Sequence, residues 1–318
     1  MNVMLTRLIK SGKRWLIDSF YTPKKSKKLL LSVILVGITV IVLGVNVFKQ
    51  RETLLTYNWQ FRPLPFVLAF IIFSLTLFMG SIVWGYVLNV ISKKLSYQKH
   101  IYFYIISNLA KRIPGTLWYV ASRAQMYSEE GIALRVTTLA SGLEMAFITL
   151  AGVITVLLFS TEIIVRYHLN PVIFAIILPV GFIILQPKFI KWFLKILRIE
   201  KINFDYKLVI FGLLSYIIIW ILGGVLLYEI GSIVYPIPHD QIGYVIGSWT
   251  FIGVISILLL FSPSNFGITE LGLSLLLSSI VPFSIAVVIA VASRILIIIF
   301  EFFWAGLFLL NNQLRKSH

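Results

Sequence analysis

Long apolar runs separated by short basic segments are the feature that most constrains how this chain can fold. Most of these runs are long enough for an α-helix to cross the hydrocarbon core of a bilayer, which takes about 20 residues. With 59% hydrophobic and only 13% charged residues, the chain has more apolar surface than a soluble domain of 318 residues can bury. The sequence therefore predicts a polytopic membrane protein, with full spans at residues 29–48, 64–91, 134–159, 171–187, 208–231 and 284–310.

The basic residues predict the orientation of these spans. The formal net charge is +16, and Lys and Arg lie mainly in segments that flank apolar runs. Because cytoplasmic loops are enriched in Lys and Arg, we expect a cell (cytoplasmic) membrane protein with both termini on the cytoplasmic side. This distribution is typical of contact with anionic lipid. It argues against nucleic-acid binding, for which a soluble basic domain is expected.

Three segments of different character divide the chain. Residues 1–28 are basic, and two interpretations stay open: an amphipathic helix on the cytoplasmic leaflet, or a solvated tail. Residues 29–312 form a single transmembrane domain. Within it, Lys residues at helical spacing in 188–201 predict a second basic amphipathic helix that links two halves. Residues 313–318 are expected to form a cytoplasmic tail.

Two of the apolar stretches are interrupted by helix-breaking residues. Pro removes a backbone hydrogen-bond donor and Gly permits a turn, so each stretch is expected to form two short helices. Such a pair would make a re-entrant hairpin that enters and leaves on one side of the membrane. For the second stretch, two full spans are the alternative. The breaks are Pro114 and Gly115 within residues 101–127, and Pro263 and Gly267 within residues 241–282.

The same order of elements recurs in the two halves of the chain, at about residues 64–159 and 208–310. In each half a span is followed by a broken hairpin and a second span, and the halves would have opposite orientations. Paired interrupted segments of this kind indicate an inverted-repeat transporter with its site where the repeats meet. The predicted fold class is an all-α polytopic membrane protein with about six full spans and two broken re-entrant hairpins.

Residues beside the first break are candidates for binding a phosphate group. Lys111 and Arg112 precede the break, and Arg123 follows it. The planar guanidinium of Arg matches phosphate, and free N–H groups at a half-helix N-terminus add positive potential. The alternative for Lys111 and Arg112 is that they only reach the cytoplasmic interface. Trp118 and Tyr119 either stack on a headgroup or serve as packing and interface anchors.

Carboxylates inside the predicted membrane segments are the second group of candidates. Glu144 lies well inside residues 134–159, where an isolated carboxylate is expected to be protonated or paired. Arg123 or Arg294 is its predicted partner, and a proton-coupling site is the alternative. Glu270 follows the second break, where it would balance charge or contact a cationic headgroup.

The residue types also narrow the chemistry. The chain has no Cys, and its four His residues lie far apart, so we expect no metal site and no cofactor. The sequence contains no Walker phosphate loop, no nucleophile elbow and no zinc-protease helix. These features favour a transporter over an enzyme.

The motifs around these candidates resemble those of a known family, the flippase-like membrane domain of lysylphosphatidylglycerol synthases. The resemblance implies transfer of a charged lipid between leaflets, such as an aminoacylated phospholipid or a polyprenyl-phosphate-linked lipid. We expect a stand-alone member without the aminoacyl-transferase domain of the fused proteins. The matching pieces are N-L-A-K-R-I-P-G-T-L-W-Y-V-A-S-R at residues 108–123, S-G-L-E ending at Glu144, S-P-S-N-F-G-I-T-E at residues 262–270, and A-S-R ending at Arg294.

Two functional hypotheses from different classes follow. The first is a lipid translocase with anionic, aminoacylated or polyprenyl-phosphate-linked membrane lipids as partners. Its headgroup cavity would lie between the hairpins, where Arg112, Arg123 and Arg294 would hold phosphate and Glu144 and Glu270 would balance charge. The second is a membrane enzyme of lipid-linked glycan or headgroup assembly that uses the same cavity. A scaffold role and a homo-oligomer stay open at this point.

Overall fold

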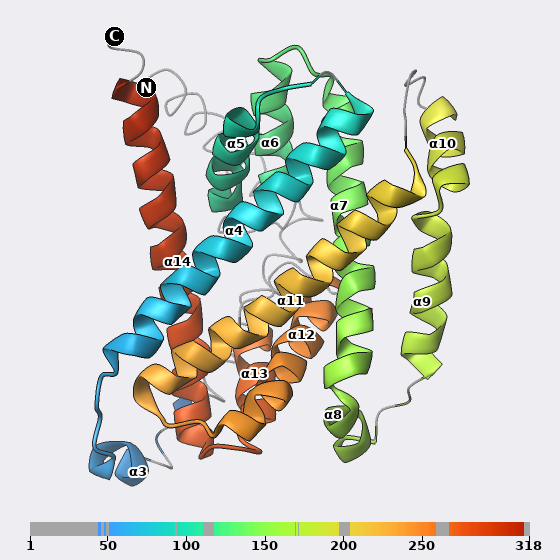
Figure 1. Cartoon of the computed structure of the whole chain (residues 1–318). Coiled ribbons are helices and arrows are strands. Elements are labelled where there is room, and N and C mark those ends of the chain that lie inside the picture. Colours follow the sequence, from blue (N-terminus) through green and yellow to red (C-terminus); the bar gives the residue numbers. More distant parts are fainter. Residues whose placement is uncertain are drawn as a thin grey trace, which may run out of the picture.

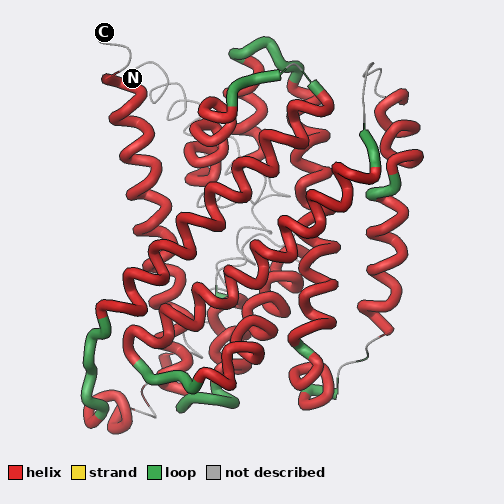
Figure 2. Tube along the Cα trace, in the orientation of Figure 1, coloured by secondary structure: helices red, strands yellow, loops and turns green. Residues whose placement is uncertain are grey.

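The computed structural model describes residues 51–92, 94–110, 118–168, 170, 172–196, 204–258 and 267–314, together with Gly44, Val45 and Phe48. Helices, turns and short loops make up this part of the chain, and no strand occurs in it (Figures 1 and 2). The all-α fold that the sequence predicts is therefore confirmed for these residues.

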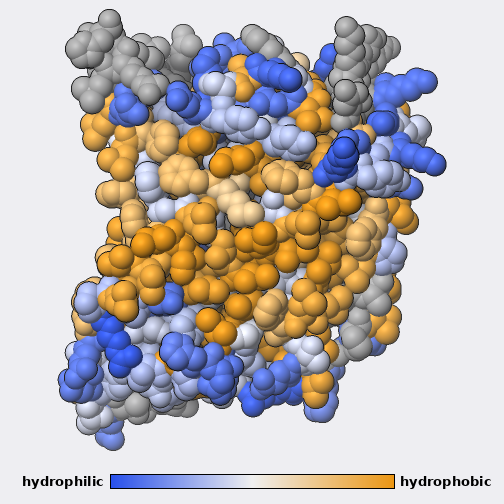
Figure 3. Space-filling model, in the orientation of Figure 1, coloured by the Kyte–Doolittle hydropathy of each residue, from blue (hydrophilic) through white to orange (hydrophobic). Residues whose placement is uncertain are grey.

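Among the residues that the structure describes, four helices are long and apolar enough to cross a membrane. They contain between 26 and 32 residues each, compared with the roughly 20 residues that a bilayer core requires. An apolar belt crosses the middle of the molecule between hydrophilic ends (Figure 3). These properties are those of a membrane-embedded protein. The helices are α4 (Pro63–Ile91), α7 (Leu134–Phe159), α11 (Tyr206–Val234) and α14 (Phe283–Leu314).

The other two predicted spans do not correspond to membrane-length helices in the described residues. Residues 171–187 correspond to α9 (Val172–Ile184), whose 13 residues are too few to cross a bilayer core as a straight helix. The span at 29–48 lies outside the described residues except for Gly44, Val45 and Phe48, and residues 1–28 lie outside them entirely. The remaining short helices are α3 (Arg51–Thr56), α8 (Thr161–Arg166) and α10 (Pro187–Ile196), the last of which overlaps the predicted basic amphipathic segment at 188–201.

Each broken stretch contains two shorter helices. In the first half these are α5 (Tyr97–Leu109) and α6 (Trp118–Ser128). In the second half they are α12 (Ile242–Leu258), which follows a 3-10 turn η2 (His239–Gln241), and α13 (Ile268–Leu277). The breaks at residues 111–117 and 259–266 lie outside the described residues, so the predicted hairpin turns stay predictions.

The two halves run in opposite directions through the molecule. Helices α4 and α11 lie side by side, pack along one another and point in opposite directions (Figure 1). Helix α7 likewise runs opposite to α14. As a result, α5 and α6 lie at one end of the molecule, and α12 and α13 lie towards the other. We call these the α5–α6 end and the α12–α13 end.

A buried hydrogen-bond network holds α5 and α6 on α4. His100 has no exposed surface, and its ring lies against Gly85, where an added Cβ would be 2.9 Å from two ring carbons. The His100 Nε2–H group donates to Asn89 Oδ1 (3.0 Å), so Nδ1 accepts from the Tyr127 hydroxyl (2.7 Å). That hydroxyl also accepts a hydrogen bond from Trp84 Nε1–H (2.9 Å). Burial lowers the pKa of His100 to about 4, which keeps the ring neutral at physiological pH.

Candidate functional site

A cavity of about 480 Å³ lies where the two halves of the chain meet. Its walls come from α4, α5 and α7 of the first half and from α11, α12, α13 and α14 of the second half. Its volume is within the range of small-molecule binding sites, which is about 300–1,000 Å³. Most of the lining is apolar or aromatic. The polar and charged lining residues are Thr76, Tyr104, Tyr216, Ser256, Thr269, Glu270, Ser293 and Arg294.

An ion pair between α13 and α14 lines this cavity. Arg294 donates to Glu270 Oε1 (2.5 Å) and to Thr269 Oγ1 (3.3 Å). The second oxygen of Glu270 accepts from the Gly267 N–H group (2.7 Å) and from the Thr269 hydroxyl (2.9 Å), so this carboxylate also caps the N-terminus of α13. The side chains of Arg294 and Glu270 are 26% and 10% exposed. We call them the open ion pair.

A second ion pair joins α6 to α7 and is sealed from solvent. Arg123 donates to Glu144 Oε2 (2.7 Å), and the two side chains are 0% and 5% exposed. The other guanidinium nitrogens donate to Ser107 Oγ (3.1 Å) and to Asn108 Oδ1 (3.2 Å), both on α5. Every guanidinium nitrogen of Arg123 therefore has an acceptor. We call Arg123 and Glu144 the sealed ion pair.

Aromatic rings enclose the guanidinium of Arg123. Its Cζ atom lies 4.1 Å from the ring centroid of Trp84, 4.4 Å from that of Tyr104 and 5.3 Å from that of Tyr119. Rings at these distances attract a cation through their negatively charged faces, most strongly where water is excluded. The enclosure stabilises a charge that would otherwise be costly in an apolar interior.

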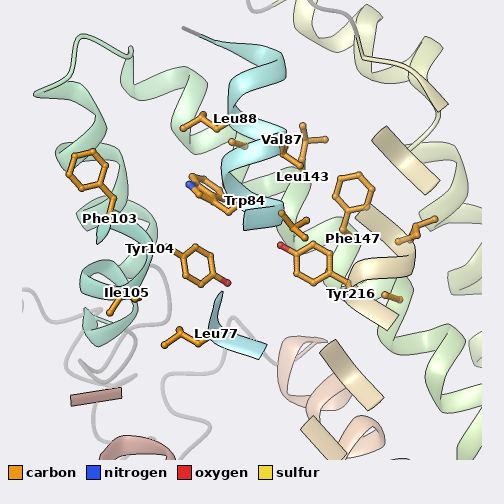
Figure 4. Packing of buried hydrophobic residues seen from close by; sticks show 14 of the residues in the cluster. Leu77, Trp84, Val87, Leu88, Phe103, Tyr104, Ile105, Leu143, Phe147 and Tyr216 are labelled. Carbon is orange, nitrogen blue, oxygen red and sulfur yellow. The ribbon is translucent and has the colours of Figure 1, made fainter. Parts of the chain in front are cut away.

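Two tyrosines separate the sealed ion pair from the cavity. Tyr104 and Tyr216 both line the cavity, and their hydroxyl groups point towards each other from α5 and α11 (Figure 4). The Tyr216 hydroxyl donates to Glu144 Oε1 (3.3 Å), and the Tyr104 ring lies over Arg123. Gly80 of α4 makes room for Tyr104, because an added Cβ there would be 2.9 Å from its hydroxyl oxygen. The two ion pairs are thus on the two sides of a thin aromatic wall.

Comparison with known proteins identifies no relative of this chain. No protein-family model matches the sequence, and no curated protein matches it either. The site is therefore interpreted from its own contacts and charges.

The predicted site residues fall into two groups. Arg123, Glu144, Glu270 and Arg294 all lie in the described residues. Arg123 pairs with Glu144, which was one of the two predicted pairings. Tyr119 is buried over Arg123, and Trp118 at the start of α6 is half-buried. The positions that lie outside the described residues are Lys111, Arg112, Pro114, Gly115 and Pro263.

Sequence reasoning did not identify Trp84, Tyr104 or Tyr216 as site residues. They are aromatic residues within apolar helices, where nothing in the residue type separates a site wall from ordinary packing. The signal that was available is the spacing of Tyr104 and Ser107, which places both on one face of α5.

The cavity lining can bind a charged group. One Arg and one Glu face the cavity together with several hydroxyl groups, and these can hold a phosphate or a cationic group by charge-assisted hydrogen bonds. Within the part of the chain that the structure describes, no three His, Cys, Asp or Glu residues are grouped closely enough to hold a metal ion.

Proposed function

We propose that this protein is a lipid translocase. It would bind the polar headgroup of a charged lipid in the central cavity and carry it between the two leaflets, while the lipid tails stay in the bilayer. The observation that carries the proposal is the open ion pair, Glu270 and Arg294, in a cavity between span-length helices.

A charged side chain at that depth costs free energy, so a charge found there usually has a role. Arg294 is well inside α14, more than ten residues from either end of this helix. Charged residues inside spanning helices mark substrate or ion paths more often than packing positions. Arg294 is the best candidate for contact with a phosphate, because its guanidinium is partly exposed to the cavity and Glu270 compensates its charge when no ligand is bound.

The arrangement of helices supports an inverted repeat. The first half has helices of 29, 13, 11 and 26 residues, and the second has helices of 29, 17, 10 and 32 residues in the same order. Equivalent long helices run in opposite directions (Figure 1). In this proposal, α5 with α6 and α12 with α13 are re-entrant hairpins inserted from opposite faces. Inverted-repeat transporters hold their substrate where such repeats meet.

The distribution of charge supports an orientation. At the α5–α6 end the described basic residues exceed the acidic ones Glu129, Glu130 and Asp205, whereas at the α12–α13 end acidic residues slightly exceed basic ones. We therefore place the α5–α6 end on the cytoplasmic side, with both termini there. The described basic residues of that end are Lys94, Lys99, Arg135, Lys188, Lys191, Lys195 and Lys207. Those of the opposite end are Arg51, Arg62 and Arg166, and the acidic residues there are Glu52, Glu162, Glu229 and Asp240.

The candidate substrates are lipids whose headgroup contains a phosphate. The sequence resemblance to the flippase-like domain of lysylphosphatidylglycerol synthases suggests three classes, namely anionic, aminoacylated and polyprenyl-phosphate-linked lipids. The charged groups of the cavity match the groups found in these headgroups. Arg294 suits a phosphate, and Glu270 suits an amine on the same headgroup.

A reconstituted assay tests the proposal. The purified protein is placed in three sets of liposomes, one for each lipid class. In each set the lipid carries a fluorophore that an impermeant reductant bleaches in the outer leaflet only. We expect the protein to accelerate the loss of inner-leaflet fluorescence for at least one class. Arg294→Gln should slow this about tenfold or more, because a charge-assisted hydrogen bond contributes about 1.5–3 kcal/mol.

Arg135→Gln is the matched control, since Arg135 is exposed at the start of α7, away from the cavity. It should transport like the parent protein. Acceleration of none of the three classes would rule out the proposal. Formation of a new lipid product from a labelled sugar donor would instead favour an enzyme.

A further inference from the structure

The two ion pairs occupy equivalent places in the two halves of the chain, with their signs exchanged. In each half the pair joins the third helix to the fourth. The first half has Arg on the third helix and Glu on the fourth, whereas the second half has Glu on the third and Arg on the fourth. The connections between these helices are equally long, at residues 129–133 and 278–282.

The second helix of each half strengthens the equivalence. Helix α5 ends with I-I-S-N-L, and α12 ends with V-I-S-I-L. Ser107 and Ser256 are therefore at the same position, two residues before the end of the helix. A proline follows each helix end by five residues in the sequence, at Pro114 and at Pro263.

The equivalent residues differ in their surroundings. Ser256, Glu270 and Arg294 line the cavity, whereas Ser107 and Arg123 are 0% exposed behind Tyr104 and Tyr216. Ser107 accepts a hydrogen bond from Arg123 Nε. One half of the molecule thus presents its charged pair to the cavity, while the other half keeps the corresponding pair closed.

The packing of the fourth helices differs in the same sense. Helix α7 packs closely on α11 and α12, whereas its counterpart α14 makes fewer contacts with α4 and α5. At the end of α7, the Ser160 hydroxyl donates to the carbonyl oxygen of Gly247 on α12 (3.0 Å). A Cβ on Gly247 would overlap the carbonyl oxygen of Phe159. The contact between α7 and α12 therefore requires glycine at position 247.

We infer that Arg123 and Glu144 form a second, closed copy of the headgroup site, and that the protein has a second conformation in which the two sites exchange roles. In that conformation α7 separates from α12, α14 closes on α5, and the sealed ion pair faces the cavity while the open one becomes enclosed. The phosphate of the headgroup would contact Arg294 in one conformation and Arg123 in the other. This inference rests on the proposed translocase.

The presence of an Arg–Glu pair in each half has a physical reason in this scheme. Each site alternates between a state with ligand access and a state without it. An enclosed Arg without a phosphate is unstable unless a carboxylate compensates its charge. Each half therefore needs its own Glu within reach of its own Arg, and the distances of 2.7 Å and 2.5 Å meet this requirement in both halves.

Thiol labelling can test the exchange, because the natural sequence has no Cys. Ser107→Cys and Ser256→Cys each introduce a single thiol at equivalent positions. With the protein in lipid nanodiscs, the small reagent 2-aminoethyl methanethiosulfonate reaches both faces. In the described conformation we expect the Cys at position 256 to react at least about tenfold faster than the Cys at position 107, since an unligated cavity admits the reagent and a packed interior excludes it.

Gly247→Ala should shift the balance between the conformations. The new Cβ meets a backbone oxygen, which cannot rotate away, so α7 has to move from α12. If the two states are populated about 1:10, a shift of about 1.4 kcal/mol makes them about equal, so we expect labelling at position 107 to rise about fivefold and labelling at position 256 to fall about twofold. Gly243→Ala, one turn earlier on α12 with no atom within 4 Å of its new Cβ, should label like the parent.

Unchanged labelling in a folded Gly247→Ala protein would overturn the inference. A rise at position 107 without a fall at position 256 would also overturn it, since this indicates loosening rather than exchange. If Gly247→Ala aggregates, Gly152→Ala on α7 replaces it, because its Cβ would lie 2.6 Å from Val254 of α12. Labelling needs no substrate, so an exchange of reactivity without lipid transport would reject the translocase and keep the second conformation.

Discussion

Arg123 shows what a charged residue requires inside an apolar helix bundle. Its guanidinium has three hydrogen-bond acceptors, a carboxylate partner and three aromatic rings, and no part of the side chain is exposed. Arg294 has the same kind of partner but remains partly exposed to the cavity. Removing one charge should therefore have different consequences at the two positions.

Removing Arg123 should destabilise the fold. Arg123→Ala leaves the Glu144 carboxylate buried without its cation, and breaking a buried pair in this way costs about 3–5 kcal/mol. The double variant Arg123→Met with Glu144→Leu should recover most of the loss, since it removes both charges. Denaturant unfolding of the purified protein in detergent measures the effect. A single variant as stable as the parent would contradict the assignment of Glu144 as the compensating group.

The His100 network predicts a dependence of stability on pH. Burial lowers the pKa of His100 from its ordinary value of 6.5 to about 4, so between these values the unfolded chain binds more protons than the folded one. The stability gained from neutral His100 is complete above pH 6.5 and is lost as the pH falls through 4. The loss amounts to at most about 3 kcal/mol.

Unfolding midpoints measured across this pH range check the prediction. His100→Gln cannot titrate there, so its stability should fall less steeply between pH 6.5 and pH 4 than that of the parent. Parallel curves would show that another group causes the acid sensitivity.

Helix packing in the second half depends on the close approach of α11 to α12. A Cβ on Gly224 of α11 would overlap the Cα atom of Ile246 on α12, and backbone cannot move aside as a side chain can. Gly224→Ala should therefore destabilise the protein by about 1–3 kcal/mol. Gly142→Ala on α7 is the control: its Cβ would have no atom within 4 Å, so the substitution should be neutral or stabilising by up to about 1 kcal/mol. Thermal unfolding measures the stability of both variants, and equal stability changes would contradict the packing argument.

The long helices were the part of the fold that could be predicted from the sequence, and the site was predictable only in part. Helix α4 begins at Pro63 and α14 at Phe283, each one residue before the predicted span, because long apolar runs permit little else in a membrane. The candidate charges Arg123, Glu144, Glu270 and Arg294 were identified because charge in an apolar run is rare. Which of them form pairs depends on helix packing, which sequence spacing does not determine.

At the scale of the whole molecule, the two ends differ in charge and should lie on different sides of the membrane. Asp240→Cys at the α12–α13 end and Lys191→Cys at the α5–α6 end each introduce a single thiol at an exposed position. In intact bacterial cells that express the protein, an impermeant maleimide should label position 240 only. Position 191 should react after the membrane is permeabilised. The opposite pattern would reverse the orientation.

The pairing of each arginine with a glutamate of its own half also bears on how a membrane voltage acts on the protein. A potential of 100 mV changes the energy of one elementary charge that crosses the whole membrane by about 2.3 kcal/mol. Each ion pair is neutral as a unit, so helices that carry it through the bilayer move almost no net charge. Any electrical sensitivity of the cycle would therefore report the charge of the cargo, and transport currents would differ in sign between an anionic and a cationic lipid.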